Sequence, residues 1–201
     1  MTISTPTATH TATHTGTSGG TAADSFEQKQ NPGQLNSVQL NIVTLVNMER
    51  AAQTGSLNDA MYMMDNSIGG PGQGTNRLET VCKQGQVLNW IVRPIDMDKR
   101  IDGTWPPMPK INSIVFLDTE LGDEEDVAER KIFTELKIYG APDRMRDKYT
   151  PVYYYWAGTV LSTAKPGLYR YRLILELEQE DTKEKLYLNT VRHPAIRVLG
   201  V

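Results

Sequence analysis

The sequence predicts an all-β fold: an antiparallel β-sandwich of the immunoglobulin-like or jelly-roll kind, preceded by a disordered N-terminal arm. About nine or ten short apolar or alternating runs are separated by turn residues, and no long helical pattern interrupts them. The run at residues 87–92 is too densely apolar for a strand with a fully wet face. We therefore expect Trp90, at the centre of that run, to anchor a packed sheet.

The composition favours one folded domain after a polar tail. Residues 1–34 are rich in Thr, Ser and Gly, with little to bury, and residues 35–201 carry the predicted sandwich. The net charge of −3 gives no basic field for nucleic acid. No run approaches the ~20 apolar residues that a membrane span needs, and no secretory signal is recognisable, so we expect a cytoplasmic protein.

The first half of the domain shows clear local signals. Residues 35–48 alternate as a strand, residues 47–52 begin a short helical turn that Gly55 ends, and residues 60–64 form a second strand. A glycine loop at 69–74 leads to a strand at 78–81. Pro94 ends the next strand, and the stiff segment after Trp105 is expected to pack that ring on the sandwich.

The second half supplies the remaining strands, of which residues 168–177 show the cleanest alternation. The others are expected at 111–117, 132–139, 152–161, 186–191 and 195–199. Residues 118–130 are acidic and are expected to form a solvated loop. In the aromatic block 153–156, Tyr154 and Trp156 share one face, so one pair of rings belongs to the core and the other to an interface or a stacking surface.

No catalytic, cofactor or metal site is predicted. Cys82 is the single cysteine, it lies in an apolar run, and we expect it to be a buried hydrophobe without a disulfide partner. Asp96, Asp98 and Asp102 have the alternate spacing of a calcium loop but lack its terminal Glu. His193, the one histidine of the folded part, has no evident nucleophile beside it, so we expect that the protein is not an enzyme.

Two non-catalytic functions remain open. A carbohydrate-binding, lectin-like module would stack sugars on aromatic rings and bind them through polar loop groups. Its candidate ligand-binding residues are Asp65, Asn66, Asp102, Trp105, Tyr154 and Trp156. A structural protein would instead use the edge strands of the sandwich, its aromatic strand and the arm to join copies of itself into a homo-oligomer, a fibre or a lattice.

An ordered set of motifs between residues 40 and 201 resembles the AidA/PixA inclusion body protein family. These motifs are the aliphatic strand 42–46, Gly55-Ser56-Leu57, Tyr62-Met63-Met64-Asp65-Asn66, Gly72-Gln73-Gly74-Thr75 with Leu78, Gly85 with Trp90, Trp156-x-Gly158, Gly167-x-Tyr169-x-Tyr171 and Pro194-x-Ile196. The resemblance implies a bacterial, cytoplasmic protein that accumulates, in some members as crystalline inclusions, and implies no enzymatic activity. The acidic residue that usually follows the first strand in the family is Asn47 here, with Glu49 two positions on. The N-terminal tail and the acidic segment 123–126 are also outside the family pattern.

Overall fold

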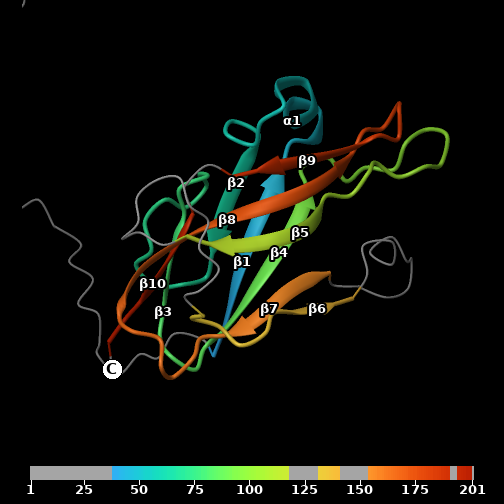
Figure 1. Ribbon diagram of the computed structural model, residues 1–201. Coiled ribbons are helices and arrows are strands. Elements are labelled where there is room, and N and C mark those ends of the chain that lie inside the picture. The colour runs from blue at the N-terminus through green and yellow to red at the C-terminus, as the bar shows by residue number, and fades with distance from the viewer. Residues whose placement is uncertain (1–37, 118–130, 141–153, 191–193, 201) are drawn as a thin grey trace, which may run out of the picture. The chain divides into compact units, whose positions relative to one another are not determined.

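The computed structural model describes residues 38–117, 131–140, 154–190 and 194–200, all within the unit Leu35–Val201. The predicted arm at 1–34, the acidic loop, Tyr153 and His193 lie outside the described residues. Ten strands and one short helix make up the described part, and the strands form two sheets (Figure 1). An all-β fold is therefore confirmed.

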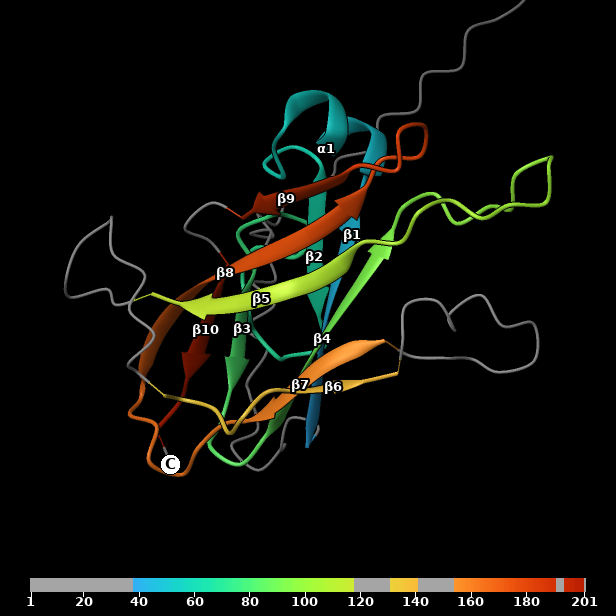
Figure 2. The ribbon, with the colours of Figure 1, turned by 45° about the vertical axis from the view of Figure 1, so that its right-hand side comes forward.

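The first sheet has the strand order β2-β1-β4-β7-β6, and the second has the order β3-β10-β8-β5, with β9 paired to β8. The strands of the first sheet are β1 (Gln39–Val46), β2 (Met61–Asp65), β4 (Val87–Pro94), β6 (Lys137–Tyr139) and β7 (Tyr155–Thr159). Those of the second are β3 (Glu79–Cys82), β5 (Lys110–Phe116), β8 (Gly167–Glu178), β9 (Lys185–Asn189) and β10 (Ala195–Val198). The helix α1 (Met48–Thr54) follows β1, and Figure 2 shows it beyond the end of the first sheet.

The expectation of purely antiparallel pairing is wrong at two places, because both sheets are mixed. β1 runs parallel to β4 along its full length, and β3 runs parallel to β10. Parallel neighbours need a long crossover between them, and here α1, β2 and β3 lie between β1 and β4 in the chain. Neither sheet closes into a barrel, and the immunoglobulin-like or jelly-roll type of the sandwich is not assigned.

One core joins the two sheets around Trp90, as the sequence predicts. Trp90 is 1% exposed, and its ring lies edge-on to Phe133 at a centroid distance of 5.4 Å and to Tyr171 at 6.1 Å. Because Trp90 belongs to β4 and Tyr171 to β8, the contact bridges the sheets. Cys82 is fully buried, as expected, and burial raises the pKa of its thiol to about 12.

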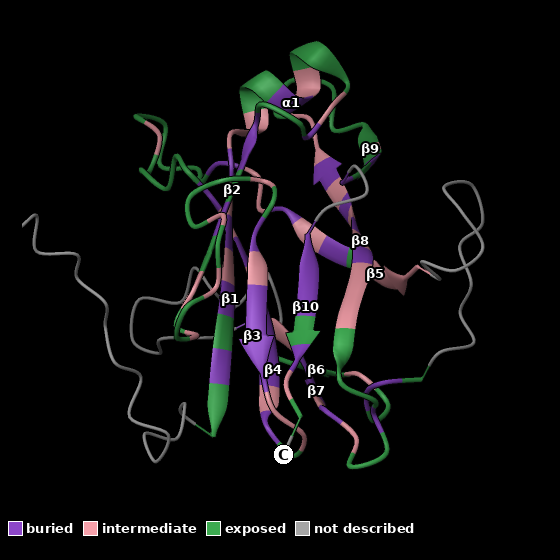
Figure 3. Cartoon of the chain, turned by 90° about the vertical axis from the view of Figure 1, so that its left-hand side faces the viewer, coloured by how far each residue is buried: buried purple, intermediate pink, exposed green. Residues whose placement is uncertain are grey.

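Local signals in the sequence correspond closely to the elements around α1. The side-chain oxygen of Asn47 accepts a hydrogen bond from the backbone N–H of Arg50 at 2.9 Å, which caps the helix, and Gly55 ends it with a φ of 62°. The alternation of β8 is also confirmed, since every second side chain from Tyr171 to Leu177 is buried. Figure 3 shows that exposed residues are prominent on α1, whereas β3, β4 and β10 are largely buried.

Two expectations about the connecting segments need correction. Trp105 is 39% exposed, and its ring faces the Lys99 amine at 6.0 Å instead of packing on the sheets. The reason is that the segment after β4 extends away from the sheets before it returns to β5 (Figure 2). The expected strand at 132–139 is regular only in β6, and Phe133 makes one isolated bridge with Val160.

Candidate functional site

Asp65 and Asn66, predicted as ligand groups, bond to the protein itself at the end of β2. One carboxylate oxygen of Asp65 accepts hydrogen bonds from the backbone and hydroxyl of Ser67 and from the side-chain amide of Gln73 at 2.7 Å. The side-chain oxygen of Asn66 accepts a hydrogen bond from the backbone N–H of Asn41 at 2.7 Å. Both side chains thus hold the end of β2 in place.

Tyr154 and Trp156 lie together, as predicted, and Tyr154 is on the buried side. Tyr154 is 5% exposed and its hydroxyl donates to the backbone carbonyl of Ile111 at 3.2 Å, while Trp156 Nε1 donates to that hydroxyl at 3.1 Å. Burial raises the pKa of Tyr154. A ring this enclosed has no open face on which a sugar could stack.

Asp102 and Trp105 lie in the segment between β4 and β5. The carboxylate of Asp102 accepts hydrogen bonds from the hydroxyl and the backbone N–H of Thr104, at 2.7 and 2.9 Å, which lower its pKa. No contact among the described residues joins these two to the other four predicted residues. Glycan binding by the six therefore stays a prediction. Trp105 is the most exposed of their three aromatic side chains.

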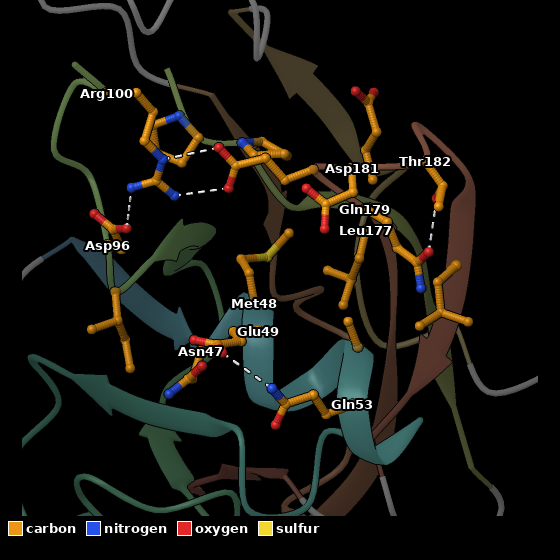
Figure 4. Close-up of a pocket in the computed structure, with 17 residues that line it drawn as sticks. Asn47, Met48, Glu49, Gln53, Asp96, Arg100, Leu177, Gln179, Asp181 and Thr182 are labelled. Atoms are coloured by element: carbon orange, nitrogen blue, oxygen red, sulfur yellow. Dashed lines mark hydrogen bonds and ion pairs between the residues drawn. The ribbon is translucent and has the colours of Figure 1, made fainter. Parts of the chain in front are cut away.

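A cavity of about 650 Å³ opens elsewhere, between α1, the segment 95–107 and the hairpin that joins β8 to β9 (Figure 4). Its lining combines carboxylates, amides and apolar side chains. The lining residues are Asn47, Met48, Glu49, Ala52, Gln53, Ile95, Asp96, Arg100, Pro106, Pro107, Leu177, Glu178, Gln179, Glu180, Asp181, Thr182 and Leu186.

Arg100 holds two walls of this cavity together. Its guanidinium forms ion pairs with Asp96 at 2.5 Å, four residues earlier, and with Glu180 at 2.8 Å on the hairpin, through two nitrogens (Figure 4). These bonds lower the pKa of Asp96 and of Glu180 and raise that of Arg100. The segment 95–107 is thereby fixed to the β8–β9 hairpin.

The charge of the lining is strongly acidic. Arg100 is its one cationic side chain among five carboxylates, and two of the five, Asp96 and Glu180, are paired with it. Glu49 accepts a hydrogen bond from the neutral amide of Gln53 at 3.1 Å, and no cation among the described residues forms an ion pair with it. Such a cavity favours cations over anions.

Sequence reasoning missed this cavity because its three walls come from distant parts of the chain. The spacing of Asp96 and Arg100 was a local signal, but the partner Glu180 lies 80 positions beyond Arg100. In the described part of the chain, no three His, Cys, Asp or Glu side chains gather closely enough to hold a metal ion. Among the same residues no helix could span a membrane, since α1 has seven residues.

Comparisons with known proteins agree with the fold and leave the family unassigned. Residues 38–104 match a family model described as a domain of unknown function (DUF8788), which covers less than half of the chain. No curated protein matches the sequence significantly. Among solved structures, the chain is similar to the crystal structure of an inclusion body protein, PixA, from Burkholderia cenocepacia. The TM-score is 0.50 and the identity 11%, over 80% of this chain and 95% of that one. At this identity the likeness shows a shared fold.

Proposed function

We propose that this protein is a non-catalytic structural protein of the inclusion type, related to the AidA/PixA family, which associates with copies of itself. The observation that carries the proposal is the likeness of its fold to that of an inclusion body protein over nearly the whole of that protein. The ordered motifs from residue 40 onward support the same relationship. Bacterial origin and a cytoplasmic location belong to this proposal.

The strand edges also support self-association. Among the described residues, the outward backbone groups at some edges form hydrogen bonds with a loop, which closes the edge, and at others they do not. The outer edge of β2 is closed by the loop after it: the backbone N–H of Met63 donates to the carbonyl of Thr75 at 3.1 Å, and that of Asp65 donates to the side chain of Gln73 at 2.9 Å. The outer edge of β3 is closed in the same way, since the N–H of Glu79 donates to the carbonyl of Pro71 at 2.9 Å. Closed edges cannot pair with another chain.

The strand β9 differs, because its outer edge receives no hydrogen bond from the described residues. The backbone N–H of Thr190 donates to Leu173, and that of Gln179 donates to Glu184, which fixes the alternation of the β8–β9 ladder. By that alternation, the backbone groups of Lys185, Tyr187 and Asn189 point outward. The side chain of Tyr187, the middle one of these three residues, is 53% exposed. An open five-residue edge is a template on which a second copy can add a strand.

Sedimentation velocity and electron microscopy of the full chain at increasing concentration test the proposal. We expect concentration-dependent assemblies, and a strict monomer at high concentration would reject self-association. Tyr187→Lys places a charge on the open edge of β9 and is expected to reduce assembly. Tyr62→Lys is the matched control, since Tyr62 is 42% exposed on the closed strand β2. Equal assembly by both variants would exclude β9 as the contact.

A further inference from the structure

We propose that the acidic cavity between α1, the segment 95–107 and the β8–β9 hairpin binds an organic cation, an ammonium or guanidinium group carried on an apolar stem. The lining does not include the outward-facing residues of β9, Lys185, Tyr187 and Asn189, and the proposal does not depend on self-association. The cavity, at about 650 Å³, lies in the size range of small-molecule sites, roughly 300–1,000 Å³.

The charges of the lining select the sign of the ligand. Arg100 is already satisfied by Asp96 and Glu180, so it offers no free cation to an incoming anion. Glu49 and Asp181 stand on opposite walls, one on α1 and one on the hairpin, and in Figure 4 the Asp181 carboxylate points toward the interior. A cation placed between these walls would gain attraction from both, whereas a carboxylate or phosphate would be repelled.

The apolar part of the lining selects a stem rather than a bare ion. Met48 projects from α1 into the cavity (Figure 4), and Leu177, Leu186 and Pro107 line it from the other elements. Methionine adapts its shape to an alkyl chain. A bare metal ion is a poor fit, since no three potential ligands gather among the residues that the structure describes. An alkylammonium fits both parts of the lining, because its charged group pairs with the carboxylates and its alkyl chain packs on the apolar side chains.

Two sources could supply this chemistry: a free amine, or a lysine or arginine side chain of a partner protein. Saturation-transfer NMR on the full-length protein can separate them, because it observes the ligand and works whether or not the protein assembles. The probes are hexylammonium for a free amine, an acetylated trilysine peptide for a protein segment, hexanol as the neutral analogue and hexanoate as the anionic one.

We expect hexylammonium to bind at least tenfold more tightly than hexanol, with no binding of hexanoate, and we expect added salt to weaken it. Stronger binding of trilysine would assign the site to a protein partner. The double substitution Glu49→Gln with Asp181→Asn should weaken hexylammonium about tenfold, and Ala52→Phe should block it by filling the cavity. Glu135→Gln, at an exposed position outside the lining, is the control, and circular dichroism melts confirm folding of each variant.

Equal binding of hexylammonium and hexanol would overturn the proposal, because the charge would then play no part. Unchanged affinity in the folded double variant would overturn it as well. The absence of hexylammonium and trilysine signals with wild-type protein would reject the site outright. None of these results bears on self-association, which sedimentation measures separately.

Discussion

The buried thiol of Cys82 should make the protein lose stability at alkaline pH. The side chain is fully buried, and its pKa is raised from 9.0 to about 12 by burial alone. At neutral pH the folded and unfolded chains both keep the proton, so the thiol contributes no pH dependence. Above pH 9 the unfolded chain releases the proton while the folded chain retains it, and unfolding becomes more favourable.

The size of the effect follows from the two pKa values. At pH 10, one unit above the unfolded value, the linkage amounts to about 1.4 kcal/mol of lost stability. The exact folded pKa matters little there, because it lies well above the working pH. Burial also raises the pKa of Tyr171, whose contribution has the same sign and begins at higher pH. Burial raises the pKa of Tyr154 as well, so the contribution of Cys82 is isolated only by comparison with a variant that lacks the thiol.

Urea unfolding followed by circular dichroism at pH 7 and pH 10 tests this reasoning, with Cys82→Ala as the control. The wild type should lose about 1.4 kcal/mol more than Cys82→Ala between the two pH values, because the variant has no thiol to titrate. The variant is less stable at every pH, but the comparison uses only the change in the free energy of unfolding between pH 7 and pH 10. An equal change in both proteins would show that the thiol ionises in the folded protein and that the site is not closed to water.

Three further substitutions test the local geometry, each by urea unfolding. Asn47→Ala removes the cap whose oxygen accepts from the N–H of Arg50, and it should cost about 1 kcal/mol; an unchanged midpoint would mean that the cap is dispensable. Gly72→Ala and Gly55→Ala both place a side chain at positive φ, which costs about 1–2 kcal/mol. A Cβ at Gly72 would lie 2.4 Å from the carbonyl oxygen of Arg77, whereas one at Gly55 meets nothing within 4 Å, so Gly72→Ala should be the more damaging. Similar losses would contradict that difference.

The features that the sequence predicts well are those set by neighbours along the chain. The cap at Asn47 and the glycine that ends α1 lie within one short segment, and each residue acts on backbone a few positions away. The alternation of β8 predicts its buried face for the same reason, since the period of two is a property of the strand itself. The burial of Trp90 follows from the density of apolar residues around it.

The features that the sequence does not predict depend on which segments, distant along the chain, contact one another in the fold. Alternation fixes the faces of a strand but carries no information about its neighbour, so the parallel pairing of β1 with β4 could not be read from either strand. The same holds for the cavity, because Arg100 meets Glu180 only after the hairpin folds back. Trp105 was expected to pack on the sandwich because the stiff proline segment after it would act as a rigid connector, yet the ring stays 39% exposed.

The polar residues near the glycine loop show how a plausible ligand group can serve the fold. Asp65 and Gln73 bond to each other at 2.7 Å, and Gln73 in turn accepts the N–H of Asp65 that would otherwise face outward from β2. The loop thus takes the place of a neighbouring strand. A protein that self-associates in a defined way needs this closure as much as it needs an open edge, because unspecific pairing at β2 or β3 would compete with the intended contact. On the proposed self-association through β9, weakening the bond between Asp65 and Gln73 should add a second mode of assembly at β2, whereas changes on β9 should remove the first.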